Sequence, residues 1–222
     1  MPILAGFVYA LRNPRDRLLT GCDPAVASLG DGARAHQRGI VLAQHPDRRE
    51  VWLEPWSDFG LELLRRNNVP EMMTHLGGPE TEEQLVARHQ RYLEYWRLGT
   101  ARMFRVVIAG VPQGVGLVGY WEKTWRDTPV YESGWSTEPA FQGRGIAARA
   151  LAAALEHAAR VGSRRYVHAF PSVENLPSNA LCRKAGFRLL SECDFEYPPG
   201  HTMRCNDWRF DLGQLSGGRI PA

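Results

Sequence analysis

A glycine-rich turn between a strand and a long, alanine-rich helix dominates this sequence. It lies within Glu132 to Arg160, which reads ESGWSTEPAFQGRGIAARALAAALEHAAR. Apolar and small residues recur at helical spacing and predict the buried face of the helix: Ile146, Ala147, Ala150, Leu151, Ala154, Leu155 and Ala158. The polar residues are predicted on the other side: Arg149, Glu156, His157 and Arg160. Because alanine favours helix and is small, we expect this helix to lie close to a sheet.

The glycines of the turn, Gly143 and Gly145, stand where the helix begins. The first turn of a helix has N–H groups without partners, and the helix dipole places positive charge there. Glycine has no Cβ, so an anion can come close to the backbone. Gln142 and Arg144 add a neutral and a charged side-chain donor. The turn therefore predicts a phosphate site, although a purely structural tight turn would use the same glycines.

A dinucleotide-binding pattern, GxGxxA, also fits Gly143 to Ala148. That pattern should follow a hydrophobic strand directly, with an acidic residue after the next strand, roughly 20 residues on. Here Pro139 to Gln142 intervenes after the strand. The next predicted strand, Tyr166 to Phe170, runs into Pro171 and Ser172 with no acid at its tip. Both departures argue against a dinucleotide.

Three short blocks occur together in one order along the chain. The first is Glu132-Ser133-Gly134-Trp135, the second is Gln142-Gly143-Arg144-Gly145-Ile146-Ala147, and the third is Asn175-Leu176-Pro177-Ser178 with Lys184-Ala185-Gly186-Phe187. They resemble the fourth strand, the Gln/Arg-x-x-Gly-x-Gly/Ala pyrophosphate signature and the N-x-x-S…K-x-G-F segment of the GNAT family of N-acetyltransferases. The resemblance extends over roughly residues 51–212. It is closest to the subgroup of ribosomal-protein N-terminal acetyltransferases and many small-molecule acetyltransferases.

The resemblance implies the acyl-CoA N-acyltransferase fold, an α/β (α+β) architecture whose central mixed sheet carries helices on both faces. The predicted elements agree, since a hairpin-rich first half precedes a strand–helix–strand–helix order. In the first half, Thr81 and Gln84 form a capping-box pattern at a helix start. Val115 to Trp121 is the predicted return strand of a hairpin.

Three segments divide the chain. Residues 1–48 carry many turn signals and no sustained period, so we expect a loosely ordered N-terminal extension. Residues 49–215 form the predicted acetyltransferase domain, and residues 216–222 form a C-terminal tail.

The co-substrate that the resemblance implies is acetyl-CoA. Its pyrophosphate would be held by the turn, at Gln142, Gly143, Arg144, Gly145, Ile146 and Ala147. In the family two central strands splay apart, and the free strand edge pairs with pantetheine like an added strand. The matching residues here are Trp135, Ser136 and Thr137. Asn175 and Ser178 would contact the cofactor arm, although both residue types also favour ordinary helix capping.

For catalysis the resemblance implies Glu132 as the base that deprotonates the amine. The alternative is a strand carboxylate that is solvated or ion-paired. Ser178 is the candidate that protonates the leaving thiolate. Many family members carry a tyrosine at the position of Cys182, whose thiol could serve instead or could simply pack in the core. Because that tyrosine is missing, a catalytically idle acyl-CoA-binding or sensor domain is the alternative function.

Composition and net charge limit which partners, metal sites and disulfides we expect. The net charge of +3 is too small to argue for nucleic acid or membrane partners. The four cysteines, at positions 22, 182, 193 and 205, form no C-x-x-C pair and have no accompanying histidine cluster. We therefore expect no metal site, no disulfide framework and a cytoplasmic protein. We also expect a monomer or a homodimer. No residue identifies the acceptor amine. The candidates for the rim of the acceptor cleft are Trp56, Met72, His75, Trp121 and Tyr197.

Overall fold

A computed structural model describes residues 40–41, 51–197, 200 and 202–216. Its strands are β1 (Ile40–Val41), β2 (Val51–Pro55), β3 (Ala101–Ile108), β4 (Val111–Trp125), β5 (Thr128–Thr137), β6 (Tyr166–Ala169), β7 (Arg188–Glu196) and β8 (Thr202–Asp211). Its helices are α1 (Gly60–Asn67), α2 (Pro70–Met73), α3 (Glu82–Leu98), α4 (Ile146–Val161), α5 (Leu176–Lys184) and α6 (Gly213–Ser216), with a short 3₁₀ helix at Pro139–Phe141. The predicted extension and tail lie outside the described residues, apart from Ile40, Val41 and Ser216.

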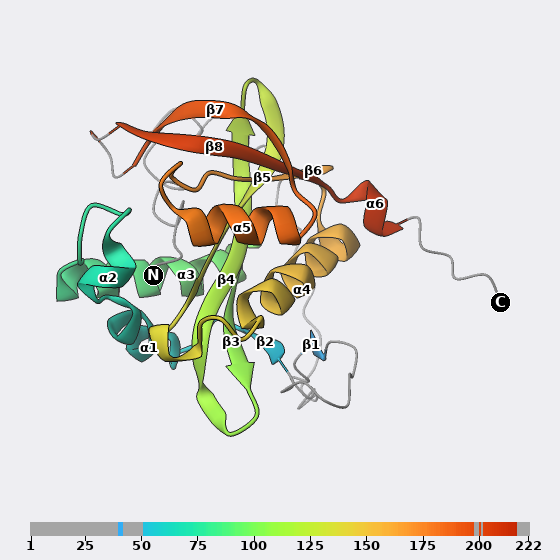
Figure 1. Cartoon of the computed structure of the whole chain (residues 1–222). Helices are drawn as coiled ribbons and strands as arrows, with labels where there is room; N and C mark the ends of the chain where they lie inside the picture. Colours follow the sequence, from blue (N-terminus) through green and yellow to red (C-terminus); the bar gives the residue numbers. More distant parts are fainter. Residues whose placement is uncertain (1–39, 42–50, 198–199, 201, 217–222) are drawn as a thin grey trace, which may run out of the picture.

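The strands form one mixed sheet in the order β1-β2-β3-β4-β5-β6-β8-β7 (Figure 1). Neighbouring strands are antiparallel except β5 and β6, which run parallel. The parallel pair is joined through α4, because parallel strands need a crossover connection. This arrangement confirms the predicted mixed sheet and its strand–helix–strand–helix second half.

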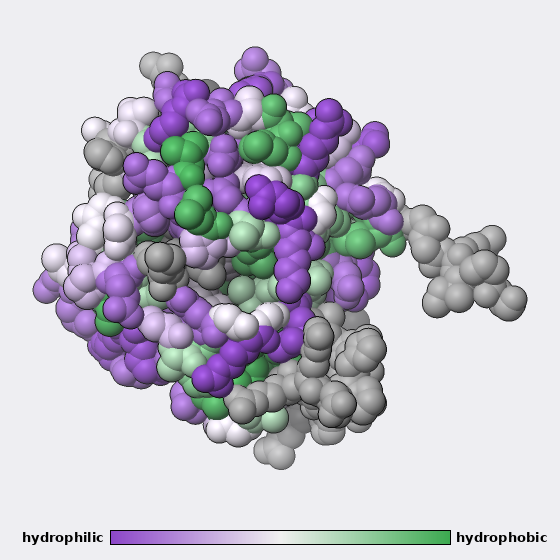
Figure 2. All heavy atoms as spheres, in the orientation of Figure 1, coloured by the Kyte–Doolittle hydropathy of each residue, from purple (hydrophilic) through white to green (hydrophobic). Residues whose placement is uncertain are grey.

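Helices cover both faces of the sheet and bury two separate apolar clusters. On one face, α4 and α5 lie side by side (Figure 1) and pack with strand residues such as Tyr131 and Trp135. On the other face, α1, α2 and α3 pack with residues such as Trp121. Because side chains alternate along a strand, β4 contributes to both clusters, with Tyr120 in the first and Trp121 in the second. Apolar residues exposed in the view of Figure 2 form small patches between hydrophilic ones.

Two predicted local details have opposite outcomes. The capping box of α3 is confirmed, since the Thr81 side chain accepts from Gln84 N and the Gln84 side chain accepts from Thr81 N. The prediction that His157 lies on the outer side of α4 is wrong. His157 is buried, and its Nδ1 lies 2.8 Å from the Tyr120 hydroxyl. None of the described helices has both the length and the apolar character that crossing a membrane requires.

Candidate active site

The two central parallel strands separate halfway along β5. Their register pairs only Tyr131 with Val167 and Glu132 with His168. Strand β5 continues to Thr137, whereas β6 ends at Ala169. On its other side β5 stays paired with β4 over this whole stretch. The edge of β5 beyond Glu132 therefore has backbone groups that β6 does not use, and an extended ligand can pair with them.

The glycine turn leads directly into α4, as predicted. Gly145 is the N-cap, with φ +71°, and Gly143 has φ +73°. No side chain caps the helix, and its first turn holds no acidic residue. A Cβ at Gly143 would meet no atom within 4 Å, and one at Gly145 would meet only Arg149 Nη1 at 3.5 Å. Both glycines thus adopt the left-handed backbone conformation, and they leave open space in front of the N–H groups of the first turn of α4.

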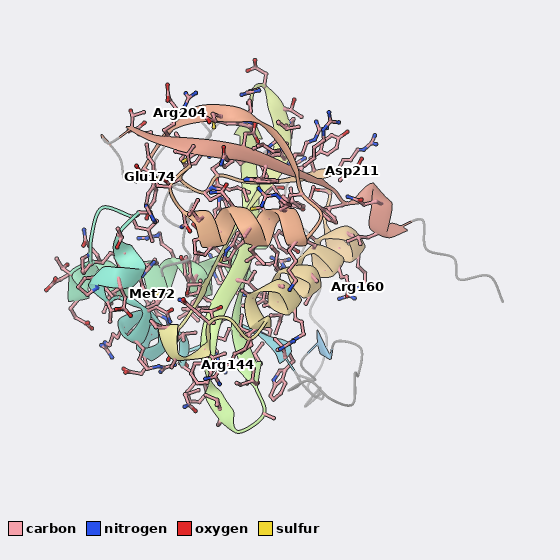
Figure 3. All side chains as sticks on the ribbon, in the orientation of Figure 1. Met72, Arg144, Arg160, Glu174, Arg204 and Asp211 are labelled. Carbon is pink, nitrogen blue, oxygen red and sulfur yellow. The ribbon has the colours of Figure 1, made fainter. Side chains whose placement is uncertain are left out.

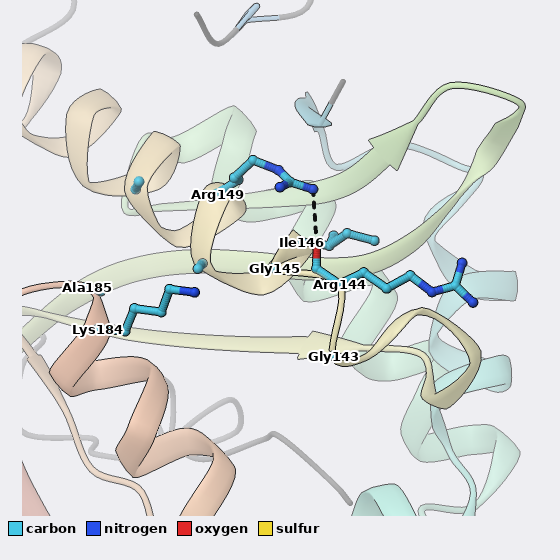
Figure 4. Close-up of a pocket in the computed structure, with 9 residues that line it drawn as sticks. Gly143, Arg144, Gly145, Ile146, Arg149, Lys184 and Ala185 are labelled. Atoms are coloured by element: carbon cyan, nitrogen blue, oxygen red, sulfur yellow. Dashed lines mark hydrogen bonds between the residues drawn. The ribbon is translucent and has the colours of Figure 1, made fainter. Parts of the chain in front are cut away.

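A cavity of about 950 Å³ opens at this helix start (Figure 4). Arg149 comes from α4 and Lys184 from α5, so the two helices border it together. Arg149 Nη2 donates to Arg144 O at 3.4 Å. The cavity is lined by three cations and six small or apolar residues: Gly143, Arg144, Gly145, Ile146, Ala148, Arg149, Ala152, Lys184 and Ala185. This positive lining suits a polyphosphate.

Gln142 and Ala147, which belong to the predicted phosphate site, do not line this cavity. Gln142 Nε2 donates to Thr137 O at 2.9 Å and lies 3.4 Å from the sulfur of Met72. Figure 3 labels Met72 beside α2 and Arg144 beside the turn. Ala147 packs against the core on the α4 face. Gln142 thus closes the loop between β5 and the turn, and its role as a phosphate donor stays a prediction.

The far end of β5 supplies two buried polar atoms that face the α4 side. Trp135 Nε1 and Thr137 Oγ1 have no hydrogen-bond partner among the described residues. Ser136 points the other way, and its hydroxyl donates to Asn67 Oδ1 of α1 at 3.0 Å. Buried polar groups are rarely left unpaired, so Trp135 and Thr137 are suited to a polar ligand.

The start of α5 shows the same property. Asn175 is the N-cap, and its Oδ1 accepts from Ser178 N at 3.1 Å, so the capping role is confirmed. Both residues are fully buried. Asn175 Nδ2 and Ser178 Oγ still have no partner within the described part of the chain. Two elements that flank the strand opening therefore each offer unsatisfied buried groups, and acetyl-CoA, with its amides and carbonyls, fits them.

Glu132 lies on the opposite face of β5, in the cluster covered by α1 to α3. Its side chain is 0% exposed, and Lys123 Nζ of β4 stands 2.8 Å from Oε2. Burial raises the pKa of the Glu132 carboxyl, while the charge and hydrogen bond of Lys123 lower it. The carboxylate is thus ion-paired, as one alternative predicted, and it also lies where the strands separate.

A second buried pair lies next to Glu132. His168, its register partner on β6, has Nδ1 2.6 Å from Asp207 Oδ1 of β8. Trp125 Nε1 donates to Asp207 Oδ2 at 2.9 Å. Lys123, His168 and Asp207 are not among the site residues predicted from the sequence. Only Lys123 left a signal, because it alternates with Trp121 along the chain, two residues past the predicted end of that strand.

The remaining candidates are core residues except His75, which is half-buried. Cys182 is fully buried among apolar side chains on the α4 face, and burial raises the pKa of its thiol. Of the rim candidates, four are buried in the opposite cluster: Trp56, Met72, Trp121 and Tyr197. Within the residues that the structure describes, no group of three or more His, Cys, Asp or Glu side chains is arranged to hold a metal ion.

Comparison with known proteins places this geometry in a family. The acetyltransferase (GNAT) domain family matches residues 50–188, more than half of the chain. No curated protein matches the sequence significantly.

Three solved structures share the fold. The ribosomal L7/L12 alpha-N-protein acetyltransferase RimL in complex with coenzyme A has 20% identity over 72% of this chain and 93% of its own, with a TM-score of 0.59. Spermidine N-acetyltransferase from Vibrio cholerae, with CoA and spermine, has 18% identity over 75% and 98%, with a TM-score of 0.62. The microcin C7 self-immunity acetyltransferase MccE, with acetyl-CoA and AMP, has 15% identity over 72% and 92%, with a TM-score of 0.60. With the family match and this shared fold, the chain belongs to the GNAT family of acetyl-CoA-dependent N-acetyltransferases.

Proposed function

We propose that this N-acetyltransferase acetylates a primary amine of a small molecule or of a protein N-terminus by direct transfer, with Glu132 as the general base. One observation carries the proposal. A fully buried carboxylate stands at the point where β5 and β6 separate, next to a lysine ammonium. A buried ionisable group with a charged partner, at the point where two central strands separate, is a typical candidate for a catalytic role.

Binding is assigned to the α4 face. The N–H groups around Gly143 and Gly145, with Arg149 and Lys184, hold the phosphates of acetyl-CoA. The free edge of β5 and the first turn of α5 hold its pantetheine arm. Bound acetyl-CoA supplies a thioester carbonyl as the electrophile.

Proton transfer is assigned to Glu132. An amine attacks only in its neutral form, so a base must first take its proton. Because burial raises the pKa of Glu132, its carboxylate is a stronger base than an exposed glutamate. The lysine beside it works in the opposite direction and lowers the pKa of the carboxyl.

Ser178 is the proposed donor of a proton to the leaving thiolate. Its hydroxyl is buried at the start of α5 and is not used by another described residue. Cys182 lies one turn further along the helix, deep in apolar packing. Its raised pKa makes the thiol a weaker acid, so we assign Cys182 to packing and the proton to Ser178.

The acceptor belongs to one of two classes. RimL acts on a ribosomal protein and the Vibrio cholerae enzyme on a polyamine. At such low identity these relatives share the fold and do not choose between the classes.

The test is release of free thiol from acetyl-CoA with a panel of polyamines, amino acids and N-terminal peptides. Acceptor-dependent thiol release supports the proposal, and the best acceptor names the substrate class. Acetyl-CoA that binds in calorimetry without thiol release across both classes would indicate the idle binding domain instead.

A further inference from the structure

Lys123 lies in β4 with its side chain almost entirely inside the protein. Its ammonium is 2.8 Å from Glu132 Oε2, and its side chain is 12% exposed. The same ammonium lies 4.5 Å from the ring centroid of Phe195 and 5.5 Å from that of Phe170. A buried ammonium is costly unless its charge is shared. Here one carboxylate and two aromatic faces share it.

Other groups act on Glu132 from the neighbouring strands. A hydrogen bond from Trp121 of β4 lowers the pKa of the Glu132 carboxyl. The electrostatic interaction with His168 of β6 lowers it as well. Tyr197 and Cys205 lie close enough that the charge of Glu132 contributes to raising their pKa values, in both cases after the larger effect of burial. Among the described residues, Lys123 is the only lysine or arginine in an ion pair with it.

The ion pair with Lys123 counteracts the effect of burial on a general base. Burial favours the neutral acid, and a protonated carboxyl cannot accept a proton from the amine. A fixed positive charge in contact restores the ionised form and also holds the carboxylate in one place. An exposed lysine would do this weakly, because water screens its charge.

We propose that Lys123 is a positioning residue of the acetyl transfer, which keeps Glu132 ionised and oriented until the amine gives up its proton. Lys123 itself releases no proton and contacts neither substrate. The inference rests on the proposed role of Glu132 as the base.

The direct test measures the Glu132 pKa without any substrate, by ¹³C NMR of its side-chain carboxyl, assigned by its loss in Glu132→Gln. Lys123→Met keeps the apolar stem and removes the charge, so the pKa of Glu132 should rise. Lys123→Arg keeps the charge and should hold the pKa near the wild-type value. Should the methionine variant not fold, Lys123→Gln makes the same comparison.

Arg105→Met is the matched control. Arg105 is a buried cation paired with Glu54 between β3 and β2. Its loss should reduce stability but leave the Glu132 pKa unchanged. If Lys123→Met also leaves that pKa unchanged, the inference is overturned.

Kinetics separates this outcome from failure of the proposed base. Lys123→Met should lower turnover at pH 7 by roughly 10²-fold, with recovery at higher pH as Glu132 ionises. Lys123→Arg should keep most of the wild-type turnover. In a Glu132→Gln background, adding Lys123→Met should lower turnover no further. If Glu132→Gln alone keeps wild-type turnover, the base assignment is wrong and the role of Lys123 falls with it, whatever the NMR shows.

Discussion

The two faces of the β4–β5 pair each bury a pair of titratable side chains, with different consequences. On the α4 face, the Tyr120 hydroxyl meets His157 Nδ1 at 2.8 Å. Burial, with the charges of nearby arginines, lowers the pKa of His157 to about 4, so this pair is neutral at physiological pH. On the opposite face, Lys123 and Glu132 meet at 2.8 Å as an ion pair.

Comparing the two pairs distinguishes a buried pair with a purely structural role from one suited to chemistry. A neutral hydrogen-bonded pair inside a core is satisfied and needs no ligand. A buried ion pair costs desolvation on both sides and is weak evidence for stability. In the proposed function, its position at the strand opening gives it a use in proton transfer. We therefore expect variants of the Tyr120–His157 pair to affect stability, and variants of the Lys123–Glu132 pair to affect turnover.

The largest expected effect is on cofactor binding. Gly145→Val puts a branched side chain at φ +71° and into the open space before the helix N-terminus, so acetyl-CoA binding should be abolished in calorimetry. Gly110→Val is the matched control, because Gly110 also has positive φ and free space, in the β3–β4 turn. Both variants should lose roughly 1–2 kcal/mol of stability. Equal acetyl-CoA affinity in the two would refute the phosphate site.

A smaller effect is expected at the start of α5. Ser178→Ala should lower turnover by roughly 10²-fold, at the low end for acid–base catalysis because a thiolate leaves readily. The affinity for acetyl-CoA should fall much less than the turnover, because only one of the proposed contacts to the pantetheine arm is lost. Ser133→Ala is the control, since its buried hydroxyl already donates to Gly119 O at 2.9 Å. Steady-state kinetics measures both, and an unchanged rate in Ser178→Ala would assign the proton donor elsewhere.

The smallest effect concerns stability on the neutral side of the comparison. Below about pH 6.5 the unfolded chain protonates His157, whereas the folded protein resists until about pH 4. The free energy of unfolding should therefore fall as pH falls, by about 2 kcal/mol from pH 7 to 5 through this residue. His157→Gln should remove this contribution to the pH dependence of the free energy of unfolding. Urea unfolding of both proteins at the two pH values checks it, and parallel pH dependences would contradict a buried neutral histidine.

Local patterns predicted the glycine turn and its helix because those residues are contiguous in the chain. The wrong placement of His157 came from treating it as polar. Its spacing from Ala150 and Ala154 already places it on the buried face.

The partners of Glu132 could not be read in the same way. Lys123, His168 and Asp207 come from three different strands, and only the register brings them together. The predicted return strand ended at Trp121, but β4 extends to Trp125 and carries Lys123 with it. Register depends on pairings between distant segments, which a sequence pattern does not fix.

The pH–rate profile of Glu132→Gln shows whether Glu132 is the base. Turnover at pH 7 should fall by roughly 10²- to 10⁴-fold. Acetyl-CoA affinity should stay close to wild type, because the proposed phosphate site is the glycine turn. The deficit should shrink as pH rises, because more of the amine is already neutral. Near wild-type turnover at pH 7, in a folded variant that binds acetyl-CoA, would contradict the claim and leave Glu132 as a structural strand residue.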